Sequence, residues 1–481
     1  MRILVVNAGS SSLKLRVLDE HDDVTSAIDL PASHGRFDRA ALGDAVAGLE
    51  GIDVVGHRVV HGGTEFTGPV RIDGEVVARL DGLSDLAPLH QPVSLAALDA
   101  ASAPLPGVAA VACFDTAFHA TLPPAAATYA LPAEWRRRFG LRRYGFHGLS
   151  HAYASRRAAA MVDRPVETLR IVTCHLGAGA SLAAVHSGRS VDTTMGFTPL
   201  EGLVMATRAG SLDPGLVLWL EEHVGTPAAE LAATFEHRSG LFGLAGTADM
   251  REVLAGSTAG DPDARLALEV YVHRLRAGIA AMAAAMGGMD ALVFTGGVGE
   301  RSPDVRKLAV SGLGFLGVEL DEAANERGEA DRTIHAADSG IPVLVVAARE
   351  DLEIAAETRR GSPPTSSRRR RRARRRQPDR DARGLGIHRR HRVAGGFGDV
   401  GVGSFPQGES VAGADVAEQG AAHPEGDDCY RCRTERDELR GFHPEVHLRH
   451  RRATGPGRHP PPGHARAQLR APQAGARLGR R

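Results

Sequence analysis

The stretch that decides the fold occurs twice in the chain. Residues 3–18 read ILVVNAGSSSLKLRVL, and residues 171–185 read IVTCHLGAGASLAAV. In each copy an apolar, largely β-branched run predicts a buried strand, a turn of small residues follows, and a second strand-like run comes after the turn. Gly9 aligns with Gly177, and Ser12 aligns with Ser181 when one inserted residue is allowed. The sequence therefore predicts a duplicated strand–turn–strand unit.

The turns of both copies are suited to phosphate groups. Glycine lets a ligand approach the backbone, and exposed N–H groups together with Ser hydroxyls bind phosphate oxygens. Two further turns are expected at residues 192–194 and at residues 295–300, the second directly after the strand predicted at 291–294. None of these turns has the GxxxxGK[ST] pattern of a P-loop, and no predicted strand is followed by GxGxxG. The set predicts an α/β scaffold of two similar lobes that close on one nucleotide.

Length and composition bound the class of protein. The chain has 481 residues, of which 43% are hydrophobic, enough for two or three domains with their own cores. No apolar run reaches the roughly 18–20 residues of a membrane helix. The N-terminus turns polar at Asn7, too early for a signal peptide. Cys113 and Cys174 lie in apolar runs, and four cysteines in all make no disulfide framework. We expect a cytoplasmic protein.

The balanced charge of the whole chain hides two different parts. Lys and Arg number 58, as do Asp and Glu, but acidic residues are in excess by 13 in 1–360 and basic residues by 13 in 361–481. The second part is rich in Arg, Gly and Pro and shows little apolar periodicity, so we expect it to be disordered. It is either a basic tail able to hold nucleic acid or an anionic membrane, or an out-of-frame translation of GC-rich DNA; the second interpretation is favoured. Its CYRC motif at 429–432 is weak evidence for a zinc site.

Polar side chains interrupt two of the predicted strands. Arg58 lies inside the apolar run 54–60, and an interior Arg must be paired or face a ligand because an unpaired buried charge is costly. Asp115 follows the strand predicted at 108–114, at the carboxyl end where ligands of α/β sheets bind. A structural ion pair and a turn cap are the alternatives. Another Arg, Arg208, is expected on a Gly-flanked loop.

Histidines add to this picture. Residues 144–151 read YGFHGLSH, which places two His and two aromatic side chains around two glycines. Arginines, histidines and a carboxylate beside phosphate turns suit phosphoryl transfer to an anionic acceptor. The acceptor and the phosphoryl group repel each other, and Arg offsets this repulsion bidentately without losing its proton. A carboxylate acceptor needs no general base because it is already ionised.

Six motifs in this order resemble the acetate/propionate/butyrate kinase family of the sugar kinase–Hsp70–actin ATPase superfamily. The motifs are VNAGSSSLK (6–14), GHRVVHGG (56–63), FDTAFH (114–119), YGFHG (144–148), MGFTPLEG (195–202) and FTGGVGE (294–300). The resemblance covers residues 1–358. It implies two duplicated ribonuclease H-like lobes with mixed sheets and flanking helices. It also implies reversible, Mg²⁺-dependent, in-line transfer from ATP to acetate, with Mn²⁺ as a substitute ion and a homodimeric assembly. Propionate or butyrate is the alternative acceptor.

The resemblance further implies a role for each matched residue. It assigns catalysis to Asp115, His147 and Arg208, and metal coordination to Asn7 and Glu350. Substrate binding is assigned to Arg58, which would hold the carboxylate, to His90 near the phosphates, and to an apolar pocket for the methyl group made by Val60, Phe146 and Pro199. The residues assigned to ATP are Lys14, His175, Leu176, Gly177, Ala178, Gly179, Asp249, Met250, Arg251, Gly297, Val298, Gly299, Glu300 and Arg301.

The chain also departs from the family pattern. Ala178 replaces the Asn of the usual HLGNG turn, which removes an amide donor worth about 1–3 kcal/mol if it bonds a charged oxygen. A degenerate lobe that binds nucleotide with weak activity is therefore a rival interpretation. Gln91 replaces an Asn, and the residues before Glu350 are altered. We expect a first lobe at 1–150, closed by the segment near 349–360, a second lobe at 151–348, and the tail at 361–481.

Overall fold

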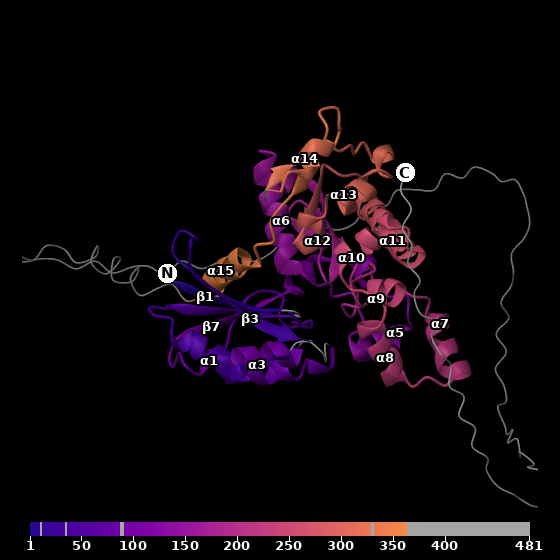
Figure 1. The fold of residues 1–481 in the computed structure, drawn as a ribbon. Coiled ribbons are helices and arrows are strands. Elements are labelled where there is room, and N and C mark those ends of the chain that lie inside the picture. The colour runs from indigo at the N-terminus through magenta and orange to yellow at the C-terminus, as the bar shows by residue number, and fades with distance from the viewer. Residues whose placement is uncertain (10–11, 34–35, 87–90, 329–330, 363–481) are drawn as a thin grey trace, which may run out of the picture. The chain divides into compact units, whose positions relative to one another are not determined.

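The computed structural model describes residues 1–9, 12–33, 36–86, 91–328 and 331–362. All of them belong to one compact unit, Met1–Arg383. They form two mixed β-sheets with helices packed against them (Figure 1). The predictions made for the Arg-rich segment, the CYRC motif and His90 lie outside the described residues.

The first sheet is built around the first copy of the repeated unit. Its strand order is β4-β3-β2-β1-β5-β7-β6. The predicted hairpin is present: β1 and β2 are antiparallel with Val6 opposite Leu15, whereas β1, β5 and β7 run parallel. The strands are β1 (Ile3–Ala8), β2 (Ser12–Leu18), β3 (Val24–Ser33), β4 (Arg36–Phe37), β5 (Val54–Val59), β6 (Val70–Arg71) and β7 (Ala109–Phe114).

The second sheet repeats this arrangement with the second copy. Its order is β10-β9-β8-β11-β13-β12, with β8 and β9 antiparallel and β8, β11 and β13 parallel. Six consecutive strands of each sheet therefore correspond in order and direction, which confirms the predicted duplication. The strands are β8 (Arg170–Leu176), β9 (Ala180–His186), β10 (Arg189–Thr193), β11 (Ala291–Thr295), β12 (Arg332–Thr333) and β13 (Val343–Val345).

Helices connect and cover the strands. The α-helices are α1 (Arg39–Ala47), α2 (Gly74–Asp81), α3 (Gln91–Ser102), α4 (Pro124–Ala127), α5 (Ala133–Phe139), α6 (Gly148–Met161), α7 (Pro214–Trp219), α8 (Ala228–His237), α9 (Gly240–Ala245), α10 (Met250–Thr258), α11 (Pro262–Ala285), α12 (Gly296–Arg301), α13 (Pro303–Val310), α14 (Glu322–Glu326) and α15 (Glu350–Gly361). Short 3₁₀ or π turns are η1 (Ser84–Leu86), η2 (Ala117–Thr121), η3 (Val166–Thr168), η4 (Leu220–Val224) and η5 (Gly314–Leu316).

Both faces of the first sheet are covered. α1 and α3 pack on one face and α15, from the far end of the described chain, packs on the other (Figure 1). Gly56 of β5 allows this close approach, because a Cβ there would lie 2.2 Å from Thr358 Oγ1 and 2.9 Å from Ile354 Cγ2 of α15. The segment predicted to close the first lobe thus lies against its sheet, with Glu350 at the start of the helix.

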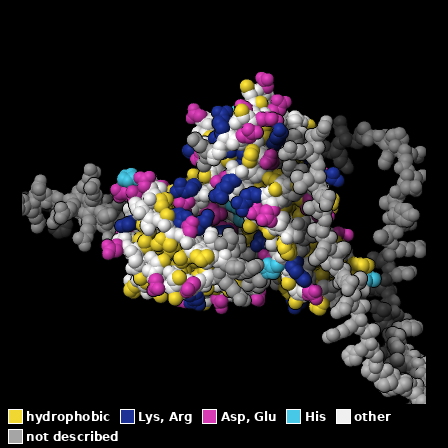
Figure 2. Space-filling view, viewed as in Figure 1, with side chains coloured by type: hydrophobic (Ala, Val, Ile, Leu, Met, Phe, Trp, Pro, Cys, Tyr) yellow, Lys and Arg dark blue, Asp and Glu magenta, His cyan; other side chains and the backbone are white. Residues whose placement is uncertain are grey.

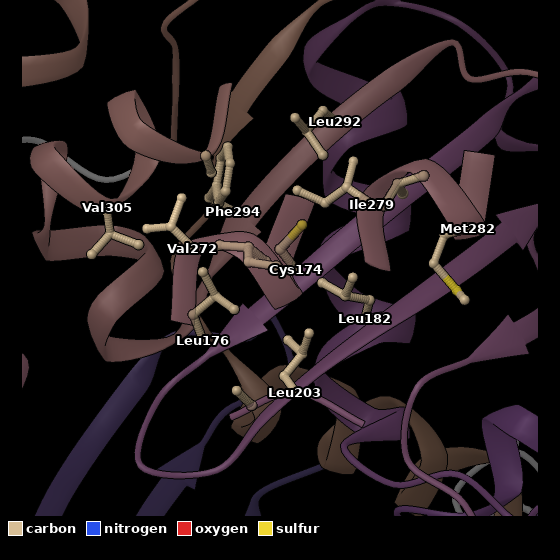
Figure 3. Packing of buried hydrophobic residues seen from close by; sticks show 14 of the residues in the cluster. Cys174, Leu176, Leu182, Leu203, Val272, Ile279, Met282, Leu292, Phe294 and Val305 are labelled. Atoms are coloured by element: carbon tan, nitrogen blue, oxygen red, sulfur yellow. The ribbon is translucent and has the colours of Figure 1, made fainter. Parts of the chain in front are cut away.

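The second sheet packs on the long helix α11. α11 begins after Asp261, whose side chain accepts hydrogen bonds from the backbone N–H groups of Asp263 and Ala264 and so caps the helix. Leu182 of β9 and Ile279 of α11 lie around Cys174 of β8 in this core (Figure 3). α11 is thus one of the flanking helices that the resemblance implies.

Two details differ from the sequence-based expectation. The expected lobe boundary after residue 150 falls inside α6, whose Leu149 packs in the core of the first sheet and whose Ala154 packs in that of the second. The turn expected over residues 295–300 is mostly helix α12. Gly296, with φ of 79°, turns the chain at the end of β11 and the helix begins there. The sequence did not predict this helix because three of its six residues are glycine, which is a poor helix former.

No helix in the described part of the chain is both long enough and apolar enough to cross a membrane.

Candidate active site

A cavity of about 550 Å³ lies where the turns of the two sheets face each other. Lys, Arg, Asp and Glu side chains gather around the hollow on the face shown in Figure 2. Most of the residues predicted as functional line this cavity: Asn7, Lys14, Arg58, Val60, Asp115, Phe146, His147, His175, Gly177, Ala178, Gly179, Pro199, Arg208, Gly297, Arg301 and Glu350.

Seven residues assigned to ATP are not among those that line it. Leu176 and Met250 are buried in the core of the second lobe. Asp249 caps α10 and pairs with Arg251, which is exposed. The remaining three are the third to fifth residues of α12: Val298, Gly299 and Glu300. Glu300 Oε1 instead accepts a hydrogen bond from the backbone N–H of Ala348 at 3.0 Å, just before α15.

A buried ion pair joins two neighbouring parallel strands of the first sheet. Arg58 lies near the end of β5, and Asp115 directly follows β7. Arg58 Nε donates to Asp115 Oδ1 at 2.9 Å, and Nη2 donates to Oδ2 at 2.6 Å. Burial raises the pKa of Asp115, and the charge of Arg58 acts against this shift. The pair is both a structural ion pair and part of the cavity wall, so the two interpretations of Arg58 are compatible.

Asn7 and Glu350 complete this cluster. Asn7 Oδ1 accepts from Arg58 Nη1 at 3.2 Å, and Asn7 Nδ2 donates to Glu350 Oε2 at 2.7 Å. Burial opposes ionisation of Glu350, but the charge of Arg58, the nearby His175 and the Asn7 amide together lower its pKa. Glu350 is therefore a carboxylate. Segments 343 residues apart in the sequence supply the two side chains.

The donor set of this cluster fits a hard divalent cation. Asn7, Asp115 and Glu350 all present oxygen atoms to one cavity, and oxygen is the donor that Mg²⁺ prefers. Within the described ranges, no group of three or more His, Cys, Asp or Glu side chains forms a metal cage. An ion of the Mg²⁺ kind takes one or two carboxylates and completes its coordination with water and phosphate oxygens.

Three segments meet at Gly179. A Cβ at Gly179 would lie 3.3 Å from His147 Nε2 and 3.6 Å from Arg208 Nη1. The missing side chain therefore leaves a space beside a ring nitrogen and a guanidinium nitrogen, both of which can donate hydrogen bonds. His147 itself has φ of 57°, which is uncommon for a residue with a side chain. The close packing of Gly148 against the carbonyl oxygen of Asp115, which accepts from its N–H at 2.9 Å, holds the chain there.

Arg208 is anchored at one edge of its guanidinium group. Its Nε donates to Glu236 Oε1 at 2.7 Å, and both side chains are largely buried. Its Nη1 approaches the carbonyl oxygen of Pro199 at 3.4 Å and lines the cavity. Arg208 is thus held by the scaffold and still reaches the cavity.

The histidines of the cavity are neutral. The rings of His147 and His175 stack with centroids 4.4 Å apart. Burial lowers the pKa of both, and the nearby charge of Arg58 acts in the same direction. At His175 the carboxylates of Glu350 and Asp115 act against this shift but do not reverse it. A neutral imidazole here is able to donate one hydrogen bond without adding a charge.

An apolar wall closes one side of the cavity. Val60, Phe146 and Pro199 contribute to it, and Phe146 is 1% exposed. His61 packs edge-on against Phe146 from behind, with ring centroids 5.6 Å apart.

Sequence reasoning missed several residues of the cavity. Arg16 lies two residues after Lys14 on β2 and pairs with Asp29 at 2.6 Å. Its place in the cavity could have been predicted from the sequence, because alternate residues of a strand lie on the same face of the sheet. Arg349 and Asp351, which bond to each other at 2.9 Å, also line the cavity. Neither residue belongs to one of the sequence motifs, and both reach the cavity only because α15 packs against the first sheet.

Comparisons with known proteins agree with this geometry. The family model described as the acetokinase family matches residues 42–356. The chain is 45% identical over 394 residues to the acetate kinase of Coprothermobacter proteolyticus, which covers 74% of this chain and 98% of that protein. It is 41% identical over 395 residues to the acetate kinase of Halothermothrix orenii, covering 75% and 99% of the two chains.

Two solved structures are similar along nearly their whole length. One is the acetate kinase of Porphyromonas gingivalis, with a TM-score of 0.68 and 36% identity over 75% of this chain and 99% of that chain. The other is a propionate kinase of Francisella tularensis, with a TM-score of 0.69 and 35% identity over the same shares.

Proposed function

The chain belongs to the acetokinase family, and we propose that it transfers the γ-phosphoryl group of ATP reversibly to acetate, giving acetyl phosphate and ADP. The observation that supports this most strongly is the presence of two buried guanidinium groups, Arg58 and Arg208, on one cavity with the glycine-containing turns of both lobes. Two anionic reactants meet at lower cost where fixed positive charges lie between them.

Arg58 and Asp115 would handle the acceptor. Nε and Nη2 of Arg58 donate to Asp115, and one N–H of Nη1 donates to Asn7. The acetate carboxylate would therefore bind to the second N–H of Nη1. The methyl group would then rest on the wall made by Val60, Phe146 and Pro199. The carboxylate is already ionised, and its oxygen attacks phosphorus directly, in line with the departing ADP oxygen.

His147 and Arg208 would stabilise the phosphoryl group in the transition state of its transfer. Negative charge spreads over three equatorial oxygens in the transition state. The space beside Gly179 is within hydrogen-bond reach of His147 Nε2 and Arg208 Nη1. One of the equatorial phosphoryl oxygens would occupy this space, which stays open because Gly179 has no side chain.

The nucleotide and its metal would lie between the lobes. The turn His175–Gly179, Lys14, and Gly297 with Arg301 of α12 would hold the phosphates and the nucleotide. Asn7 and Glu350 would hold Mg²⁺, or Mn²⁺ in its place. When bound, the ion would neutralise charge on the phosphate oxygens.

Acetate is the proposed acceptor, and propionate is the second candidate because one similar structure is a propionate kinase. One methylene group changes kcat/KM by only about 10- to 200-fold. The rate of acyl phosphate formation should therefore be compared for acetate, propionate and butyrate by trapping with hydroxylamine. We expect acetate to give the highest kcat/KM. ATP binding with no acyl phosphate from any acceptor would refute the proposal and favour the degenerate lobe.

We also propose that the protein is a homodimer and acts in the cytoplasm, where ATP is available. Several large apolar side chains are exposed around α7 and η4, among them Leu216, Leu218, Trp219 and Val224, and exposed apolar clusters often mark interfaces. Sedimentation velocity of the wild type and of Trp219→Glu tests this assembly. A monomeric wild type would refute it.

A further inference from the structure

A chain of buried polar side chains leads away from the cavity behind His147. Ser181 Oγ lies 2.9 Å from His147 Nδ1 and 2.8 Å from His151 Nε2. His151 Nδ1 in turn lies 2.7 Å from Thr173 Oγ1. Ser181, His151 and Thr173 are each 0% exposed. Water has no access to this chain, so the side chains must satisfy one another.

The position of the ring of His147 limits which nitrogen can act in the cavity. Nε2 is the nitrogen next to the space at Gly179, whereas Nδ1 faces Ser181. A phosphate oxygen in that space is a hydrogen-bond acceptor only, so Nε2 must carry the proton. Burial and neighbouring positive charges lower the pKa of His147 well below its usual value. The ring therefore has one proton, and Nδ1 must accept a hydrogen bond.

One arrangement of protons satisfies every atom of the chain when phosphate is present. Ser181 donates to His147 Nδ1 and accepts from His151 Nε2–H. His151 Nδ1 then accepts from the hydroxyl of Thr173, whose oxygen lies 2.7 Å from this nitrogen and 3.4 Å from the competing carbonyl oxygen of Ala183. Burial lowers the pKa of His151 as well, so it also carries a single proton and fits this arrangement.

We propose that Ser181, acting together with His151 and Thr173 behind it, is a positioning residue that holds His147 in the tautomer with its proton on Nε2, directed at the transferred phosphoryl group. The inference rests on the proposed function, because the phosphoryl group is what requires a donor at Nε2. Ser181 does not touch the substrate and acts only through His147.

The second lobe offers a matched control for the key variant. Ser190 of β10 is also 0% exposed, and its Oγ lies 2.7 Å from His119 Nδ1. The Nε2 atom of His119 contacts the carbonyl oxygen of Phe146 at 3.0 Å, and His119 does not line the cavity. Ser181→Ala and Ser190→Ala thus remove the same kind of hydrogen bond from two buried Ser–His pairs. Only His147 has its other ring nitrogen beside the space at Gly179, whereas His119 bonds the backbone of Phe146 and packs edge-on against His151.

The test measures kcat, the KM values for acetate and ATP, and ring ¹⁵N spectra of ¹⁵N-histidine-labelled protein with MgATP, in which His147→Gln identifies the His147 signals. We expect Ser181→Ala to lower kcat by about tenfold or more, to leave both KM values within about twofold, and to lose the uniform Nε2–H form of His147. Ser190→Ala should keep kcat within about twofold.

A second pair of variants covers the case in which Ser181→Ala does not fold. Thr173→Val removes the last hydroxyl of the chain at equal size, and Thr173→Ser keeps it. We expect Thr173→Val to lower kcat and Thr173→Ser to restore it. Any of three results would overturn the inference. They are an equal loss of kcat in Ser181→Ala and Ser190→Ala, an unchanged tautomer of His147 in Ser181→Ala, and an equal loss of kcat in both Thr173 variants. A wild type without acyl phosphate formation would instead refute the proposed function, since the tautomer is read without turnover.

Discussion

Filling the space at Gly179 is the sharpest perturbation that the site allows. The backbone of Gly179 does not require glycine, because its φ lies outside the left-handed range, yet an added Cβ would lie 3.3 Å from His147 Nε2 and 3.6 Å from Arg208 Nη1. A phosphate oxygen bonded to both nitrogens would need the same space. Gly179→Ala should therefore exclude the oxygen while leaving the fold intact.

The size of the effect follows from the two hydrogen bonds that would be lost. Hydrogen bonds to charged groups contribute about 1.5–3 kcal/mol each. Loss of both amounts to about 3–6 kcal/mol, which lowers kcat/KM by about 10²- to 10⁴-fold. The melting temperature should not fall, because Ala in place of Gly at a compatible position reduces the entropy of the unfolded chain.

The assay is initial-rate formation of acetyl phosphate, with thermal unfolding of the same preparations. Gly74→Ala is the control, because a Cβ there meets no atom within 4 Å and Gly74 starts α2, away from the cavity. It should leave kcat/KM unchanged. If Gly179→Ala keeps kcat/KM within about threefold of the wild type, the space beside His147 and Arg208 does not hold the phosphoryl group.

Three further changes test other features of the molecule. Ala178→Asn restores an amide donor beside the phosphates and should raise kcat/KM for ATP by up to about 10- to 100-fold; an unchanged value in the same assay would mean that the amide has no partner here. Burial raises the pKa of Glu357 to about 6, so its folded form holds a proton more tightly than the unfolded chain and stability falls as pH rises from about 4.5 through 6. Glu357→Gln should therefore stabilise the protein against urea by up to about 2 kcal/mol at pH 7.5 and by little at pH 4.5, and equal effects at both pH values would contradict this. Burial lowers the pKa of His57 to about 4, so stability should be lost as pH falls from 6.5 towards 4, and His57→Leu should flatten that decline in urea unfolding; an unaltered slope would exclude His57 as its source.

The parts of the structure that the sequence predicted are those with a local signal. The apolar runs that begin at Ile3 and Ile171 predict strands, and the glycine-containing turns after them indicate where each strand ends. The sequence placed Arg58 inside one apolar strand and Asp115 at the carboxyl end of another. The structure shows that these two strands are parallel neighbours, which brings the two side chains together. Family resemblance then supplied the roles.

What the sequence did not reveal depends on contacts between distant segments. Gly179, His147 and Arg208 come from a hairpin turn, a helix start and a loop, and no spacing in the sequence brings them together. Arg349 reaches the cavity only because α15 returns to the first sheet. Met250 was assigned to the ATP site, but its apolar side chain packs in the core instead of lining the cavity.

If fixed guanidinium charge overcomes the repulsion between two anionic reactants, the loss of Arg208 in Arg208→Ala must slow the chemical step. Rapid-quench measurement of a single turnover separates the chemical step from nucleotide binding. We expect the chemical step of Arg208→Ala to slow by about 10²- to 10³-fold while the Kd of ATP changes little. Arg238→Ala, which removes an exposed arginine that follows α8, should change neither. A single-turnover rate in Arg208→Ala within a few-fold of the wild type would show that its charge does not assist phosphoryl transfer.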